Sequence, residues 1–391
     1  MTKRVIIYRD ELLPYSETFI PAQVENYSSY AGFYVGTSCC RGAQYPLSVE
    51  KMAILSNFAK LTPNRNIFFK LTEGLGYSGW FNHLKSLSAC LIHAHFGLDG
   101  VWALPIARKL KIPLIVTFHG YDIAINGVGK HDLSNFYGPT PLPQVYLWRR
   151  HRLFKKAHCC IAVSEFIRSK LIEKGCPPNK IVVHCIGVDI DKFSPDASIS
   201  TEPIVLFIGR LVEKKGCEYL IQAMAKVQSI LPELELVIIG DGYLRAALEQ
   251  QAANSLQNYR FLGVQSSDTV RQWMNRSLLL CAPSVTDIKG DSEGLPITIL
   301  EAQAMELPVI SSVHAGIPEA ILHGKTGFLA QEKDWEMLAE YILTLANNSQ
   351  LRSEFAIAGR QRMEQTFNLK SNTAKLEAIY DRILENRILK G

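Results

Sequence analysis

The stretch "EGLPITILE", residues 293 to 301, places a glutamate at each end of nine residues that begin as a loop and end as a helix. Gly294 and Leu295 would present backbone N–H groups beside a helix that starts at Pro296, which is an arrangement suited to phosphate. Helix side chains lean towards the N-terminus, so Glu301 would reach back to the same ligand. Eight residues span ~12 Å in a helix, whereas a glycosidase holds its two carboxyl groups roughly 5 to 9.5 Å apart. The pair therefore predicts a clamp on one extended ligand made of a sugar, a diphosphate and a ribose.

Two cations follow another predicted strand. In "FIGRLVEKKG", Arg210 comes directly after Gly209 and the strand, and Lys215 lies five residues further on, just before a helix. A guanidinium and an ammonium at the mouth of one loop suit a diphosphate, because Arg can bind it bidentately and Lys acts as a point charge. We interpret the neighbouring Lys214 as a solvated loop charge.

The first half of the chain offers histidines where predicted strands end. "HAHFG" holds His93 and His95, and "TFHGYD" holds His119 with Asp122. Histidines at the ends of adjacent strands can line one pocket and donate to sugar hydroxyls or handle a proton, although each alone is as well explained as a hydrogen-bonded core residue. Earlier, Ser16 in "PYSETFI" is a good N-cap for a helix that would direct free N–H groups at a ligand, or would merely be capped.

The elements that would position these residues alternate regularly along the chain. We expect strands at 4–8, 32–38, 90–96, 113–119, 159–164 and 181–187, and after them at 203–210, 234–240, 258–263, 277–284 and 307–312. Helical patterns fill the gaps, for example at 98–110 and 165–174, and continue from about Asp334 onwards. Apolar strands alternating with helices predict an α/β protein with parallel sheets covered on both faces.

The length of the chain and a polar linker both predict two domains. A chain of 391 residues favours two domains, and the polar segment "GVDIDKFSPDASISTEPIVLF" is the best linker. We predict domains at 1–190 and 191–372, with a C-terminal helix at about 373–391 packing back on the first. Two doubly wound sheets would leave a cleft, and ligands bind outside the carboxyl ends of such strands. "DID" at 189–191 lies in this linker, so we give it a structural interpretation.

Composition narrows the class of protein. Residues 1–192 carry a net charge of +10 and the remainder −5, which suggests an anionic surface or acceptor for the first half, or simply a soluble basic face. The basic, aromatic segment 146–158 would lie on an anionic membrane or present a solvated helix face. No apolar run reaches eighteen residues, so we expect a cytoplasmic protein, peripheral on the membrane's inner face. Nine cysteines without C-x-x-C spacing are interpreted as reduced thiols, and we expect no metal site and no nucleic-acid partner.

These motifs together resemble the retaining glycosyltransferases of the GT-B fold, specifically glycosyltransferase family 4, over nearly the whole chain. The most specific part is "PSVTDIKGDSEGLPITILEAQAMELPVISSVHAGIPEAILHGKTGFL", which resembles the family's E-x7-E segment and the turns after it. "GRLVEKKG" resembles its Arg/Lys loop and "HCIGVDIDKF" its interdomain hinge. "SETFI", "HAHFG" and "TFHGYD" are similar to the branch that acts in bacterial exopolysaccharide and colanic-acid-type synthesis.

The resemblance implies an activity and a role for each residue. The activity would be transfer of a hexose from a UDP- or GDP-sugar to a lipid-linked or oligosaccharide acceptor, with anomeric configuration retained and no metal or other cofactor. The implied roles are stabilisation of the leaving diphosphate by Arg210 and Lys215 beside Gly209, contact with the donor sugar by Glu293 and His119, contact with sugar and phosphate by the Gly294 and Leu295 amides, ribose binding by Glu301, and an acceptor side made by Ser16, His95 and Asp122.

Two departures and two rival functions accompany this resemblance. Many members carry Gly-Gly where this chain has "PYSETF", and the family usually has Gly where Glu306 stands, at a helix end that favours a left-handed residue. The rivals are a nucleotide-sugar 2-epimerase on the same fold and a non-catalytic nucleotide-sugar-binding protein. The E-x7-E segment favours the transferase over the epimerase, and the set of Arg210, Lys215 and the two glutamates favours it over the binding protein.

Overall fold

The computed structural model describes residues 2–12, 14, 17–40, 48–58, 62–124, 141–288 and 290–388. The chain divides into two compact units, Met1–Ile186 with Lys370–Gly391 as unit 1, and Gly187–Leu369 as unit 2. The sequence had predicted boundaries at 190/191 and 372/373, in the same linker and near the start of the last helix. Within that linker Asp189 Oδ1 accepts the N–H groups of Asp191 and Lys192, at 3.1 Å each.

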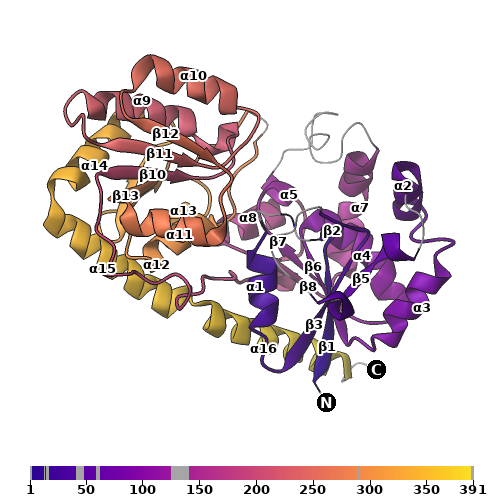
Figure 1. The fold of residues 1–391 in the computed structure, drawn as a ribbon. Coiled ribbons are helices and arrows are strands. Elements are labelled where there is room, and N and C mark those ends of the chain that lie inside the picture. The colour runs from indigo at the N-terminus through magenta and orange to yellow at the C-terminus, as the bar shows by residue number, and fades with distance from the viewer. Residues whose placement is uncertain are drawn as a thin grey trace. The chain divides into compact units, whose positions relative to one another are not determined.

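Unit 1 is built on a seven-stranded parallel sheet (Figure 1). In spatial order its strands are β5 (Met52–Ile54), β3 (Tyr30–Gly36), β1 (Lys3–Tyr8), β6 (Leu91–His95), β7 (Leu114–Phe118), β8 (Cys159–Ala162) and β9 (Ile181–Val183). A separate pair joins β2 (Glu11–Leu12) to β4 (Ser38–Cys39). The strand order reverses between β1 and β6, so the loops after these two strands flank the point where ligands bind in such sheets.

Helices lie on both faces of this sheet. They are α1 (Phe19–Glu25), α2 (Pro63–Leu71), α3 (Ser78–Ser86), α4 (Gly97–Leu110), α5 (Tyr121–Ala124), α7 (Leu142–Lys156), α8 (Glu165–Glu173) and α16 (Leu369–Ile388). The last helix packs on unit 1, where Leu376, Ile379 and Tyr380 join the core beneath β1 and β3. Its Glu377 also accepts hydrogen bonds from the backbone N–H groups of residues 28 to 30.

Unit 2 repeats the plan with six parallel strands. Their spatial order is β12 (Tyr259–Gly263), β11 (Glu235–Ile239), β10 (Ile204–Ile208), β13 (Leu279–Ala282), β14 (Val309–Ser312) and β15 (Gly327–Ala330). The helices are α9 (Cys217–Gln228), α10 (Arg245–Ser255), α11 (Ser267–Arg276), α12 (Ile297–Ala304), α13 (Ile317–Ala320), α14 (Trp335–Asn347) and α15 (Ser349–Thr366). Here the strand order reverses between β10 and β13, the two strands that precede the Arg/Lys loop and the acidic loop.

The predicted α/β class is confirmed, and every predicted strand is present. The sequence missed the short β2, β5 and β15 and predicted only the first residue of β4, because these few residues carry no alternating pattern. It was wrong about two helix starts: α1 begins at Phe19, later than the helix expected directly after Ser16, and Pro296 is the N-cap of α12 rather than its first residue. Among the described helices none is long and apolar enough to span a bilayer.

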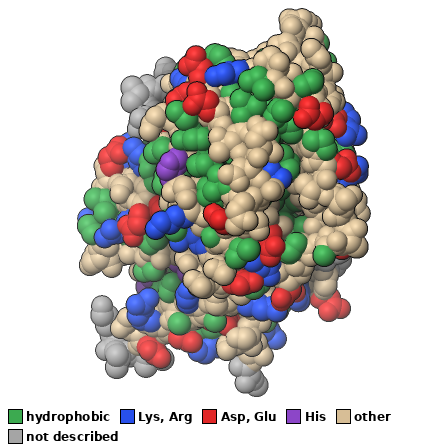
Figure 2. All heavy atoms as spheres, turned by 90° about the vertical axis from the view of Figure 1, so that its left-hand side faces the viewer, with side chains coloured by type: hydrophobic (Ala, Val, Ile, Leu, Met, Phe, Trp, Pro, Cys, Tyr) green, Lys and Arg blue, Asp and Glu red, His purple; other side chains and the backbone are tan. Residues whose placement is uncertain are grey.

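Charged side chains of both signs occur together on one face of the molecule. On the face drawn in Figure 2, acidic and basic side chains lie interspersed among hydrophobic ones. The acidic bias of the second half of the sequence therefore does not appear as a single-sign patch on that face.

All nine cysteines are free thiols, five of them buried.

Candidate active site

The loops after β10 and β13 meet in unit 2 because a glycine lets them approach. Gly216 ends the 3-10 turn Glu213–Lys215 with φ +63°, and a Cβ there would lie 2.0 Å from the carbonyl oxygen of Pro283. Only glycine combines that backbone conformation with such a contact. The close approach places the Arg/Lys loop directly against the start of the acidic loop.

Lys215 and Glu293 form an ion pair across these two loops, with 2.9 Å between Nζ and Oε1. Glu293 is buried. Burial alone would raise the pKa of its carboxyl group, but the charges of Lys215 and Lys214 outweigh this and lower the pKa to about 2. Glu293 is therefore a carboxylate at neutral pH, held against an ammonium group.

Lys214 is also buried, which corrects the interpretation of this residue as a solvated loop charge. Its side chain turns inwards and pairs with Asp291, 3.1 Å away. The pKa of Asp291 is raised by burial and partly restored by Lys214. The consecutive lysines thus hold two alternate acids of one loop, Asp291 and Glu293.

Arg210 differs from the two lysines in its partners. It lies just after β10 and is half-buried, and within the described part of the chain no carboxylate lies within ion-pair distance of its guanidinium. Gly209 beside it makes a close backbone contact, since a Cβ on Gly240 would lie 1.9 Å from the Gly209 carbonyl oxygen. A guanidinium without a carboxylate partner at this position can accept an anionic ligand.

The start of α12 supplies backbone donors. Gly294 is buried and Leu295 half-buried, and both come just before Pro296, the N-cap of the helix, whose first N–H groups have no partner within it. Glu301, in the second turn of α12, is half-buried. Burial raises the pKa of Glu301 to about 7, against an opposing effect of Lys192. Unlike the carboxyl group of Glu293, that of Glu301 therefore changes its charge near pH 7.

Sequence reasoning missed two residues that support the acidic loop. His314, buried two residues after β14, accepts the N–H of Glu293 on Nε2 at 3.1 Å. Its Nδ1 lies 2.6 Å from Oε1 of Glu332, after β15. A histidine directly behind a strand in "SSVHAG" was the available signal, but its partner lies 18 residues further along the chain and no spacing rule joins them.

In unit 1 three histidine rings stack on one another, those of His93 and His95 in β6 and that of His119 directly after β7. His93 is bonded through both ring nitrogens, to Tyr380 Oη at 2.6 Å and Thr117 Oγ1 at 2.7 Å. His95 Nδ1 lies 3.1 Å from His119 Nε2. Burial lowers the pKa of all three, that of His119 to about 3. His93 is thus a core histidine, and the neutral His119 can exchange hydrogen bonds but carries no charge at pH 7.

The remaining predicted residues of unit 1 have different outcomes. Asp122 is buried, and its carboxylate accepts the N–H groups of Gly97, His119 and Gly120 at 2.7 to 3.1 Å. It therefore holds the loop that carries His119, and its expected contact with an acceptor stays a prediction. Ser16 lies outside the described residues.

A buried charged cluster follows β1, and the sequence interpretation missed it. Arg9 binds both carboxylate oxygens of Glu17 at 2.8 and 2.9 Å, and it reaches Asp99 at 2.7 Å. Burial raises the pKa of Asp99 to about 7 while Arg9 opposes the shift. Arg9 also lies over the ring of Phe96, 4.7 Å from its centroid. "RD" at the end of an apolar strand was the signal for this cluster.

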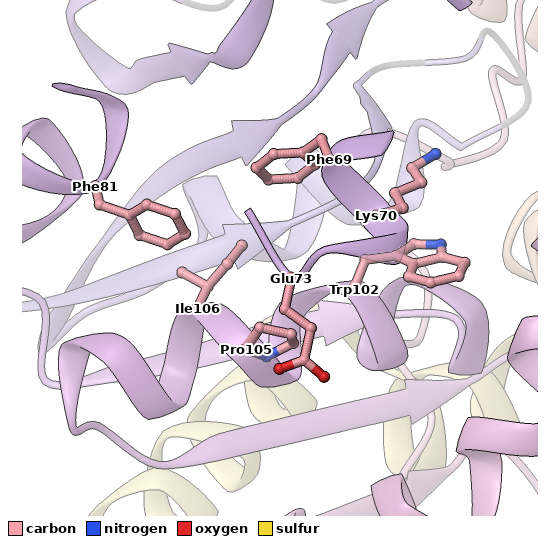
Figure 3. Close-up of a pocket in the computed structure, with 7 residues that line it drawn as sticks. All are labelled: Phe69, Lys70, Glu73, Phe81, Trp102, Pro105 and Ile106. Carbon is pink, nitrogen blue, oxygen red and sulfur yellow. The ribbon is translucent and has the colours of Figure 1, made fainter. Parts of the chain in front are cut away.

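Next to this cluster lies a small hollow between α2, α3 and α4 (Figure 3). Its walls are mainly aromatic and aliphatic, and its two charged residues are already paired, Lys70 with Asp10 and Glu73 with Arg108 and Arg152. We therefore attribute the hollow to packing and place no ligand in it.

Comparisons with known proteins fit this geometry. A family model described as "Glycosyl transferases group 1" matches residues 189–362, and one described as "Glycosyltransferase Family 4" matches residues 65–192. The amylovoran biosynthesis glycosyltransferase AmsK of Erwinia amylovora is 31% identical over 306 residues, which is 76% of this chain and 72% of AmsK. The chain belongs to glycosyltransferase family 4.

Two further proteins resemble this glycosyltransferase. A GDP-mannose-dependent alpha-(1-6)-phosphatidylinositol monomannoside mannosyltransferase of Mycolicibacterium smegmatis is 26% identical over 304 residues, 72% of this chain and 74% of that one. The crystal structure of Anabaena HepE in complex with UDP-glucose superposes with a TM-score of 0.74 at 19% identity, over 97% of this chain and 99% of HepE. The fold is GT-B, with two Rossmann-like domains, and the protein is a glycosyltransferase.

Proposed function

We propose that this glycosyltransferase moves a hexose from a nucleotide diphosphate sugar to a lipid-linked or saccharide acceptor, with retention of anomeric configuration, in synthesis of a cell-surface polysaccharide or glycolipid. The observation that carries the proposal is the Lys215–Glu293 ion pair at the switch point of unit 2, beside an Arg210 without a carboxylate partner among the described residues. A carboxylate, two cations and a helix N-terminus together match a sugar joined to a diphosphate.

The roles follow from the charges. Arg210 and Lys215 stabilise the negative charge that develops on the departing diphosphate. The backbone N–H groups of Gly294 and Leu295 reach sugar and phosphate, and ionised Glu293 accepts hydrogen bonds from sugar hydroxyls. Glu301 accepts hydrogen bonds from the ribose hydroxyls. Each group thus serves a different part of one extended donor.

The chemical step uses the donor's own leaving group as base. The bond between the anomeric carbon and the diphosphate oxygen breaks, and the acceptor oxygen bonds to that carbon on the same face. The acceptor's hydroxyl proton passes to the diphosphate oxygen, so atoms and charge balance without a protein nucleophile. In this proposal neutral His119 contributes a hydrogen bond to the donor sugar near the reacting carbon. The roles proposed for His95 and Asp122, and for Ser16 outside the described residues, are contacts with the acceptor.

The proposal requires no metal or other cofactor. The positive charge that a divalent cation supplies to a diphosphate is provided here by Arg210, Lys215 and the start of α12. The proposal therefore expects the same transfer rate before and after treatment with EDTA, and a rate that falls and returns with added Mg²⁺ would contradict it.

We place the enzyme in the cytoplasm, peripheral on the inner face of the membrane. The support is α7, whose inner face buries Leu142, Tyr146, Leu153 and Phe154 while Trp148 is 77% exposed among basic residues. An exposed tryptophan within a cationic helix face suits an anionic lipid surface. The M. smegmatis relative, named for a phosphatidylinositol acceptor, supports a lipid-linked substrate.

The donor can be identified directly. The compared proteins include a UDP-glucose complex and a GDP-mannose-dependent enzyme, so both bases are candidates. A calorimetric screen of UDP-, GDP- and ADP-sugars should give binding by one base, and NMR of the product should show the donor's anomeric configuration. Inverted configuration, or a changed sugar in the absence of acceptor, would overturn the proposal.

A further inference from the structure

His314 has one tautomer that satisfies its two shortest hydrogen bonds, while the Thr286 hydroxyl lies 3.5 Å from Nδ1. Its Nε2 faces the N–H of Glu293 at 3.1 Å, so this nitrogen must accept, and the ring hydrogen is on Nδ1. Nδ1 then donates to Glu332 Oε1 at 2.6 Å. A carboxylate behind a histidine fixes the ring's orientation and tautomer in the same way at metal sites. The neutral imidazole therefore links Glu332 to the backbone of the acid that holds Lys215.

Glu332 also holds the other end of the acidic loop. Its Oε2 accepts the N–H of Thr286 at 2.8 Å, and its Oε1 accepts the Thr286 hydroxyl at 3.1 Å. Thr286 lies four residues after β13 and Glu293 seven residues further on. One carboxylate thus fixes the start of the loop directly and its functional end through His314.

We propose that His314 and Glu332 are positioning residues of the donor site. They fix the backbone of Glu293, so that its side chain, which has several rotatable bonds, meets Lys215 in one arrangement. The proposal rests on the function proposed above for Glu293. The pairing partner of the imidazole is the N–H of Glu293 itself, which distinguishes His314 from a histidine that only fills space. His323, which accepts the N–H of Leu329 at 3.0 Å, provides a matched comparison.

The first test needs no substrate. Hydrogen exchange of a peptide covering residues 291–295 should become about tenfold faster in His314→Ala, since the variant loses one backbone hydrogen bond. Peptides from β10 should be unchanged, and His323→Ala should leave residues 291–295 as protected as in the unmodified chain. Unchanged protection of residues 291–295 in a folded His314→Ala would overturn the proposal.

The second test follows the effect into ligand binding. The probes are UDP-glucose with UDP and GDP-mannose with GDP, whichever pair the unmodified chain binds. His314→Ala should weaken binding of the nucleotide sugar about tenfold and binding of the nucleoside diphosphate less than about twofold, because the ligand group proposed to contact Glu293 is the sugar. His314→Gln, which keeps an acceptor for the Glu293 N–H, should recover part of the loss. Equal weakening of both ligands would contradict the proposal.

A double variant separates this inference from the proposed function. In a Glu293→Gln background, His314→Ala should weaken the nucleotide sugar by less than about twofold, because both changes act through one side chain. The same tenfold loss in both backgrounds would show that His314 acts elsewhere. If Glu293→Gln alone binds the nucleotide sugar as the unmodified chain does, the role proposed for Glu293 fails, while the exchange experiment still decides whether His314 fixes its backbone.

Discussion

The two glutamates that end "EGLPITILE" have pKa values shifted in opposite directions, although Glu293 is buried and Glu301 half-buried. Glu293 has the charges of Lys215 and Lys214 beside it, which lower its pKa to about 2. Glu301 has only the weaker opposing effect of Lys192, so burial raises its pKa to about 7. One acid is therefore permanently charged, and the other becomes a full acceptor only as the pH rises.

Donor binding should depend on pH through Glu301. Its pKa of about 7 lies above the usual carboxyl value, so the ionised form, which we propose accepts hydrogen bonds from the ribose, is lost as the pH falls. We expect the Kd of the nucleotide sugar to rise about tenfold from pH 8 to pH 6, in proportion to the lost carboxylate. Calorimetry at both values measures this. Glu301→Gln should bind more weakly at pH 8 with little change to pH 6, and an equally steep dependence in that variant would refute the assignment.

Sequence reasoning identified the residues that we propose bind the ligand more readily than the residues that support them. Arg210, Lys215 and Glu293 follow strands and carry recognisable spacing. Lys214 was misjudged because a 3-10 turn rotates it towards Asp291, 77 residues away in the chain. His314 and Glu332 were missed for a similar reason, since tertiary contacts alone bring them to the acidic loop.

At the scale of elements, α12 ends at a strained position. Glu306 directly follows its C-cap with φ +56°, where a side chain costs conformational energy that glycine avoids. The left-handed residue expected there is confirmed. Glu306 lies at the opposite end of α12, which is eight residues long, from the backbone N–H groups that we propose bind the phosphate.

Glu306→Gly should relieve this strain. We expect the free energy of unfolding to increase by up to about 1 kcal/mol, the gain being limited by the greater freedom of glycine in the unfolded chain. Urea denaturation measures the change, and activity should be unaffected. Glu306→Ala keeps a Cβ and should show no such gain. A glycine variant less stable than the alanine variant would contradict the account.

The exposed face of α7 makes a separate prediction. Trp148→Ala should reduce binding to vesicles containing anionic lipid by roughly tenfold, since an exposed indole loses the apolar surface that it would bury in the bilayer. Co-sedimentation measures the bound fraction. Ile230→Ala in unit 2 removes another exposed apolar side chain, 56% exposed, and should have no effect. Binding unchanged by Trp148→Ala would exclude α7 as the contact.

At the scale of the whole molecule, two sheets of similar plan carry different chemistry. In unit 2 charged groups lie at the switch point, where Lys215 and Glu293 form an ion pair. In unit 1 neutral histidines and the buried Arg9 cluster lie at the carboxyl ends of the strands. Strand alternation predicts both sheets, because apolar runs bounded by turns are a strong local signal. The networks that tie the loops together are non-local, and hydrophobic periodicity carries no information about them.

The central claim is that Lys215 stabilises the leaving diphosphate while Glu293 holds the sugar. The most direct measurement is the rate at which nucleoside diphosphate is released from the donor identified by the binding screen, in the presence of membrane lipid extract as acceptor. Lys215→Ala should lower this rate by about 10²- to 10³-fold while circular dichroism shows a folded protein. Lys226→Ala, which removes a half-buried lysine of α9, should not change it. A Lys215→Ala enzyme as fast as the unmodified chain would contradict the account.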